Sequence, residues 1–360
     1  MAVQVILFIL ATILFSIIGW QARRSGDLAA QYQRLLQWWG LALGAFVGYT
    51  LLSYRFIADT LAADPTAVAL GGSAQTRGLL AVALSLAAGV VLWLLVYSQR
   101  LRLALCRLFP APTAPEWDET TRPWPRQRRG FDPQSPIHAV ALGLALLLFL
   151  QTLVEFILAG GQAGLTPEDL SQNELVLSSG LTALMLLTVT LVGAGLGQDR
   201  SWRATLTRLG LRWPTVNELA IGVGIGGLLI AFQYVAGFVW QALTPESIFQ
   251  QQTELVQAIA GGVTSMGAAL LVATFSAVGE EVAFRGGLQP VIGLWPTAIL
   301  FALTHLQYQF TPATLIILVV GLALGWARQH FGTVAAITTH FTYNFTLLAL
   351  AVLASQLPTG

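Results

Sequence analysis

The chain alternates between long apolar runs and short polar segments along its whole length. A membrane-spanning helix needs about 20 apolar residues, and ten runs approach or exceed that length. They are apolar on every face, which favours helices over the alternating strands of a barrel. The pattern therefore predicts an all-α, polytopic transmembrane bundle of about ten spans (eight to ten), at residues 2–20, 37–57, 78–98, 137–159, 175–196, 217–242, 263–288, 292–309, 312–328 and 333–355.

Composition supports this fold class and excludes several functions. Of the 360 residues, 55% are hydrophobic and 10% are charged, whereas soluble domains carry about 25% charged residues. All 18 basic residues are arginine, which excludes a lysine nucleophile or Schiff base. The single Cys106 excludes an internal disulfide and a cysteine metal cage. No basic cluster is interleaved with stacking aromatic residues, so we expect no nucleic-acid partner.

The distribution of arginine predicts how the chain is oriented in the membrane. Arginines accumulate in cytoplasmic segments, and 16 of the 18 follow odd-numbered spans, with Arg55 and Arg77 as the exceptions. We therefore expect both termini outside and the arginine-rich segments in the cytoplasm, in a prokaryotic plasma membrane or an equivalent internal membrane. Residues 1–20 lack a charged leader and a cleavage site, which predicts a retained span rather than a signal peptide.

Two segments and one acidic residue leave more than one interpretation open. Residues 107–136 are rich in proline and arginine, which is typical of an extended linker. Residues 199–214 are amphipathic and predict either a helix along the membrane surface or an ordinary basic loop. Glu155 lies near the outer end of its span, where a snorkelling or hydrogen-bonded carboxylate is the favoured interpretation.

Three charged residues interrupt the apolar run at 263–288. An ionised side chain at the centre of a bilayer costs about 2.5–3.5 kcal/mol on insertion scales, so Glu280, Glu281 and Arg285 must face a protein interior or a wet cavity. Glu281 and Arg285 are four residues apart and share a helix face, where they can pair. Glu280 is rotated by about 100° from Glu281 and lacks that partner, which favours a general acid/base role.

Further polar residues occur in the two later spans at 292–309 and 333–355. His305 follows Phe301 by one helical turn, and Asn344 follows His340 by one turn. With a rise of 1.5 Å per residue, Glu280, His305, His340 and Asn344 all fall roughly 10–20 Å from the cytoplasmic side. We therefore expect them to meet inside the bundle. Packing histidines and a structural ion pair are the alternatives, and His138 and His330 fit that simpler interpretation.

The three motifs Glu280-Glu281-x-x-x-Arg285, Phe301-x-x-x-His305 and His340-x-x-x-Asn344 together resemble the CPBP (Abi) family of intramembrane proteases. That family includes the type II CAAX prenyl endopeptidases and bacteriocin-immunity proteins. The resemblance covers about the last 100 residues. We therefore expect a CPBP-type protease region at 137–360 with its motif core at 263–350, preceded by accessory spans at 1–109 that the resemblance does not cover and by the proline- and arginine-rich cytoplasmic linker at 110–136.

The resemblance also implies roles for these residues in hydrolysing a peptide bond near the cytoplasmic face. Glu280 and His305 would activate a water, and His340 with Asn344 would polarise the scissile carbonyl and stabilise the oxyanion. Glu281 and Arg285 would support the helix and orient Glu280. The partners would be a peptide or membrane-protein substrate and the lipid bilayer.

A zinc ion is a candidate cofactor, with Glu280, His305 and His340 as its ligands. The sequence has no His-Glu-x-x-His helix, which favours metal-independent chemistry. Two other functions stay open. One is an ion-coupled transporter, because intramembrane carboxylates also mark ion pathways, although no inverted repeat is present. The other is a non-catalytic immunity or scaffold protein of the same fold.

Overall fold

The computed structural model describes residues 2–23, 27–63, 74–109, 130–158, 171–305 and 311–356. Every element named within these ranges is a helix, and eight are long and apolar enough to cross a membrane. The predicted fold class, a helical polytopic bundle, is thereby confirmed at the lower end of the expected range of spans. Most of the proline-rich segment, residues 110–129, lies outside the described residues.

The helices that precede the polar motifs occupy the chain up to residue 262. They are α1 (Ala2–Arg23), α2 (Leu28–Ala63), α3 (Ala74–Tyr97), α4 (Gln99–Leu105), α5 (Pro136–Leu158), α6 (Gln172–Gly193), α7 (Trp202–Leu209), α8 (Val216–Leu243) and α9 (Glu246–Gly262). Those that carry or follow the motifs are α10 (Met266–Glu280), the π-helix η2 (Glu281–Leu288), α11 (Gln289–Ile292), α12 (Leu294–Leu303), α13 (Pro312–Phe331) and α14 (Thr333–Ser355).

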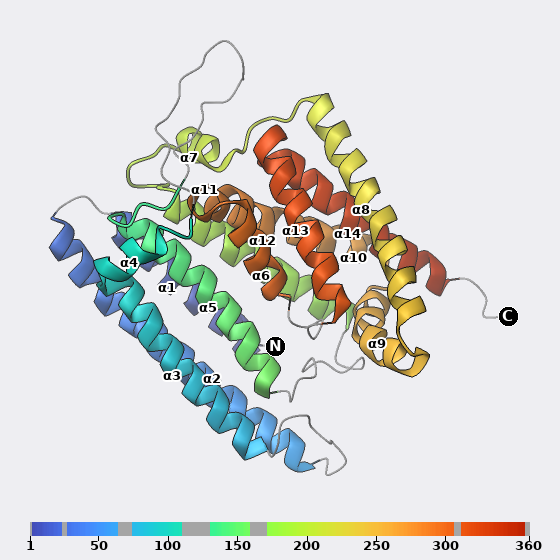
Figure 1. Cartoon of the computed structure of the whole chain (residues 1–360), viewed down its shortest axis with the longest axis horizontal. Helices are drawn as coiled ribbons and strands as arrows, with labels where there is room; N and C mark the ends of the chain where they lie inside the picture. The colour runs from blue at the N-terminus through green and yellow to red at the C-terminus, as the bar shows by residue number, and fades with distance from the viewer. Residues whose placement is uncertain are drawn as a thin grey trace.

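The bundle has two parts that meet along α5, α6 and the motif helices (Figure 1). Helices α1, α2, α3 and α5 pack around the fully buried Trp39, whose indole N–H donates to the Leu92 carbonyl at 3.0 Å. Gly143 on α5 lies directly against the Trp39 ring. Helices α8, α10, α13 and α14 form the other part, and α6 bridges the two by packing on α1 and α10.

One of the ten expected spans is much shorter than the sequence pattern suggested. Helix α12 has 10 residues, or about 15 Å at 1.5 Å per residue, which is half of a bilayer core. It begins after Gly293, whose φ of 90° ends α11, and the described chain continues from it as a turn at Thr304 and His305. Helix α1 has 22 residues, which is as long as the span expected at 2–20.

Two helices occupy segments for which the sequence predicted no span. Helix α9 covers 17 residues after α8, between the spans expected at 217–242 and 263–288. Helix α7 lies within the amphipathic segment at 199–214, with Ser201 accepting from the Ala204 N–H at its start and Gly210 at φ 72° as its end. Its Leu209 is fully buried, so α7 packs on the bundle and is not an ordinary loop.

Glycine allows α8 and α14 to approach each other closely. A Cβ atom at Gly222 or Gly226 would lie 2.7 or 2.8 Å from the Cβ of Thr338 or Thr342 on α14. Small residues four apart are typical of close helix contacts in membranes, where packing rather than the hydrophobic effect holds helices together. Because α14 carries His340 and Asn344, this contact also positions part of the polar motifs.

This packing predicts opposite outcomes for two neighbouring glycines of α8. Gly226→Ala should lower the free energy of unfolding by about 1–3 kcal/mol, the usual cost of overpacking. Gly224→Ala meets no atom within 4 Å, so it should leave stability unchanged or raise it by about 1 kcal/mol through helix propensity. Unfolding of the purified chain in detergent measures both, and equal effects would contradict the close contact.

Candidate active site

The helix that carries the acidic pair is held close to its neighbours by small side chains. Ser265 caps α10 by accepting from the Ala268 N–H at 3.2 Å. Further along, Gly279 lies against Ala183 of α6, and a Cβ there would come within 2.7 Å of the Ala183 Cα. This close contact fixes the end of α10 immediately before Glu280.

At Glu281 the helix changes from α to π geometry and stays so to Leu288. The Gln289 N–H bonds the Phe284 carbonyl in the π register. The backbone N–H of the next residue would bond to the carbonyl of Arg285 or Gly286, but that residue is Pro290, which has no N–H to donate. Side chains from other helices take its place: Arg328 Nε donates to Arg285 O at 3.1 Å, and Arg208 Nη1 donates to Gly286 O at 3.3 Å.

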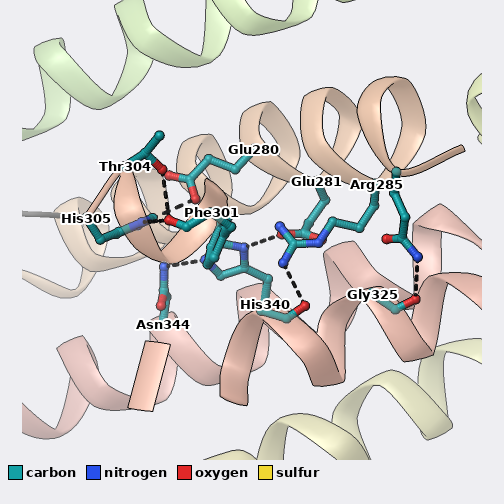
Figure 2. A network of polar contacts seen from close by, with 11 residues as sticks. Glu280, Glu281, Arg285, Phe301, Thr304, His305, Gly325, His340 and Asn344 are labelled. Atoms are coloured by element: carbon teal, nitrogen blue, oxygen red, sulfur yellow. Dashed lines mark hydrogen bonds and ion pairs between the residues drawn. The ribbon is translucent and has the colours of Figure 1, made fainter. Parts of the chain in front are cut away.

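Glu281 is the acceptor at the centre of a fully buried ionic cluster (Figure 2). Its Oε1 accepts from Arg285 Nη1 at 3.1 Å and from His340 Nδ1 at 2.9 Å. Arg285 also donates to the Gly321 carbonyl at 3.1 Å and stacks over the Phe301 ring, 4.2 Å from its centroid. The carboxylate and the guanidinium balance each other's charge, and His340 adds a second donor to the carboxylate.

Glu280 lies on the other side of this helix turn and faces His305 (Figure 2). Glu280 Oε2 and His305 Nε2 are 3.9 Å apart, and both side chains are about 21% exposed. The His305 Nδ1 atom lies 2.7 Å from the Phe301 carbonyl, which also accepts from the Thr304 hydroxyl at 2.8 Å. A carbonyl can only accept, so Nδ1 carries a proton, and Nε2 is the ring nitrogen that lies towards Glu280.

The distance between Glu280 and His305 suits a shared water better than a direct hydrogen bond. Hydrogen bonds to a reacting proton span about 2.6–3.2 Å, so 3.9 Å is too long for direct contact. One water can lie within hydrogen-bond reach of both atoms. Both groups would then act as acceptors for its protons, which is the arrangement that raises the nucleophilicity of water.

His340 fixes the orientation of Asn344. With its Nδ1 proton donated to Glu281, the His340 Nε2 lone pair accepts from Asn344 Nδ2 at 3.0 Å. One amide N–H of Asn344 is used in this bond and the second remains as a donor. The buried pair of Glu281 and Arg285 thus acts through His340 to position an amide beside Glu280 and His305.

The structure brings together all six residues that the sequence singled out, from three separate segments of the chain. They form two clusters. One is the partly exposed pair of Glu280 and His305. The other is the buried ion pair of Glu281 and Arg285, to which His340 and the partly buried Asn344 are hydrogen-bonded in turn. Sequence reasoning missed Arg208, Arg328 and the π geometry. The signal was Pro290, which lies four residues after Gly286 and leaves carbonyls without a backbone donor.

The residues expected to be ordinary packing or surface groups lie away from this site. Glu155 accepts from Tyr49 at 2.6 Å and from Gln151 at 3.3 Å, which confirms a hydrogen-bonded carboxylate. His138 accepts from the Asp132 N–H at 2.9 Å on a different helix from the motifs.

The donor set does not fit the zinc ion considered from the sequence. Within the described residues, no three His, Cys, Asp or Glu side chains are grouped so that they could hold a metal. His340 already uses Nδ1 for Glu281 and Nε2 for Asn344, so it has no lone pair to give unless the Asn344 bond breaks. The mechanism that we propose for these residues therefore has no metal-dependent step.

Fold and site together define a multi-pass integral membrane protein with a carboxylate–histidine cluster inside its bundle. In comparisons with known proteins, the model of one family, type II CAAX prenyl endopeptidase Rce1-like, matches residues 262–346. The matched range contains all six site residues and begins where α9 ends. No curated protein and no solved structure matches the chain. The match supports a membrane-embedded hydrolase of peptide bonds.

The buried ion pair predicts a specific pattern of stability changes. Arg285→Met leaves the Glu281 carboxylate buried without its guanidinium, and the free energy of unfolding should fall by about 3–5 kcal/mol. The double variant Glu281→Gln/Arg285→Met removes both charges and should regain most of that loss. Chemical unfolding in detergent measures the cycle. A double variant as unstable as the single one would contradict the charge-pair account.

Proposed function

We propose that the chain is an intramembrane endopeptidase in which Glu280 and His305 activate the attacking water. The observation that carries this proposal is the approach of Glu280 Oε2 and His305 Nε2, which lie 3.9 Å apart at a partly exposed position in the bundle. The family match over residues 262–346 supports the reaction class. The substrate class suggested by that match is a CAAX-type peptide at the membrane.

Each proton in the proposed reaction has a place to go. Glu280 removes a proton from the water while His305 orients it, and the hydroxide forms a bond to the carbonyl carbon. The carbonyl π electrons move to oxygen. Collapse of the tetrahedral intermediate breaks the C–N bond, and Glu280 returns the proton to the leaving amine. Such general acid–base catalysis contributes about 10²–10⁴-fold.

Asn344 is the group we assign to the developing oxyanion. Its second amide N–H remains after the bond to His340, and that bond holds the amide in one orientation. Preorganised donors of this kind contribute about 10²–10³-fold in acyl-transfer enzymes. His340 then acts through Asn344 as a positioning residue, and Glu281 with Arg285 fixes His340 in turn.

We assign the rest of the chain to regions on either side of this site. Residues 263–350 form the catalytic core within a protease region at 137–360, residues 1–109 are accessory spans, and 110–136 connect them. The arginine-rich side faces the cytoplasm, and the active site opens towards that side.

Glu280→Gln and His305→Ala should each lower cleavage of a CAAX-type peptide in proteoliposomes by at least about 100-fold, because each removes an acceptor for water. Both should unfold at the same temperature as the wild type. The control is Glu155→Gln, a membrane carboxylate bonded to Tyr49 away from the site, which should cleave normally. Normal cleavage by Glu280→Gln would rule out the mechanism, and complementation in cells by this variant would favour a scaffold.

The donor set predicts that activity survives metal removal. After chelation and dialysis, the purified chain should hold less than one zinc per ten molecules by elemental analysis and should cleave within about twofold of the untreated rate. Since His340 would have to leave Asn344 to bind a metal, added zinc should not raise the rate. Activity that is lost on chelation and restored only by metal would overturn this part of the proposal.

A further inference from the structure

A cavity of about 420 Å³ lies on the far side of η2 from the acidic motif residues, between α1, α5 and α6. Its volume is within the range of ligand sites, about 300–1,000 Å³. From η2 it is lined by Ala283, Phe284, Gly287 and Leu288. Glu281 and Arg285 instead face α13 and α14. The mechanism proposed above uses no residue of this cavity.

The cavity has an apolar interior and a positively charged mouth. The interior is formed by aliphatic side chains of α5 and α6, among them Leu144, Leu148, Met185 and Val189. The mouth is lined by three arginines that come from separate segments of the chain, namely Arg23, Arg200 and Arg208. Such a pocket is complementary to an anionic amphiphile, whose apolar tail would fill the interior and whose charged group would bind the arginines.

Two of the arginines, Arg23 and Arg200, meet beside Gly195. A Cβ atom built on Gly195 would lie closest to Asp199 Oδ1, and 3.0 Å from Arg23 Nε and 3.2 Å from Arg200 Nη1. The carboxylate of Asp199 binds Arg23 at 2.6 Å, and Asp132 is the one acidic residue among those that line the cavity in the described part of the chain. Three cations against these two carboxylates leave the mouth net positive.

The positive charges also repel one another. Burial, followed by the charges of Arg200, Arg328 and Arg23, lowers the pKa of the Arg208 guanidinium to about 10. It therefore stays protonated at neutral pH, but in an environment that disfavours its charge. An anion at the mouth would offset this repulsion, since a charge-assisted hydrogen bond to phosphate is stronger than a neutral one.

We propose that this cavity binds an anionic phospholipid, with the phosphate headgroup at Arg23, Arg200 and Arg208 and an acyl chain between α5 and α6. The lipid would come from the leaflet on the arginine-rich side of the bundle. It would contact Ala283 and Gly287 directly, and Arg208 would join its headgroup to the Gly286 carbonyl. A bound lipid would thereby stabilise the π-helix that begins at Glu281, directly after Glu280.

The test uses the purified full chain in detergent and dioctanoyl phosphatidylglycerol as the probe. Retained lipid is counted by native mass spectrometry, and the apparent affinity is taken from the rise in unfolding temperature. We expect phosphatidylglycerol to bind at least about tenfold more tightly than dioctanoyl phosphatidylcholine, a difference of about 1.4 kcal/mol. Inorganic phosphate should give no comparable stabilisation, because it leaves the apolar interior unfilled.

Variants separate the cavity from general surface charge. Arg200→Gln and the filling variant Ala141→Phe should each weaken phosphatidylglycerol binding at least about tenfold. The matched control is Arg203→Gln, which removes the same charge from an exposed position of α7 that does not line the cavity. It should bind as the wild type does.

Several outcomes would overturn the proposal. Equal binding of the two lipids would show that the arginines do not recognise the headgroup charge. Equal losses for Arg200→Gln and Arg203→Gln would indicate attraction to the surface, and unchanged binding by Ala141→Phe would exclude the cavity. Stabilisation by phosphate alone would identify a free-anion site. All these readouts are independent of peptide cleavage.

Discussion

The fully buried pair of Glu281 and Arg285 is the interaction on which the site depends. Neither charge is tolerable alone inside an apolar bundle, and each is stable only because the other lies 3.1 Å away. The carboxylate orients His340, and the guanidinium is held by the Gly321 carbonyl and the Phe301 ring. Four helices, η2, α12, α13 and α14, are thus joined at one point, in a medium where the hydrophobic effect does not bring helices together.

The π-helix is the second constraint, and its cause is local. Pro290 deprives the preceding turn of backbone donors, so the chain needs donors from elsewhere to end this helix inside the protein. Arg208 from α7 and Arg328 from α13 supply them. These two residues count as ordinary positive-inside arginines in the sequence. In the structure they bond to carbonyls of the π-helix that directly follows Glu280. Short stretches of π-helix are frequent at functional sites.

Two adjacent carboxylates acquire different environments in this way. Glu281 is fully buried and its charge is balanced, whereas Glu280 is partly exposed and faces a histidine acceptor across 3.9 Å. The first environment fixes a carboxylate in one position through its ion pair, and the second leaves a carboxylate within reach of water. The same helix borders an apolar cavity with a cationic mouth on its other face, so the proposed chemistry and the proposed lipid site share one structural element.

The sequence by itself determined the helical membrane fold and selected the six site residues, because charges within apolar runs are costly and their helical spacing is visible in the chain. It also indicated the division between Glu280 and Glu281, since one residue rotates a side chain by about 100°. Tertiary structure alone decided that α12 is only half a span, that α7 packs under η2, and that His340 binds both Glu281 and Asn344. These facts depend on contacts between segments tens of residues apart, which no local pattern of residues records.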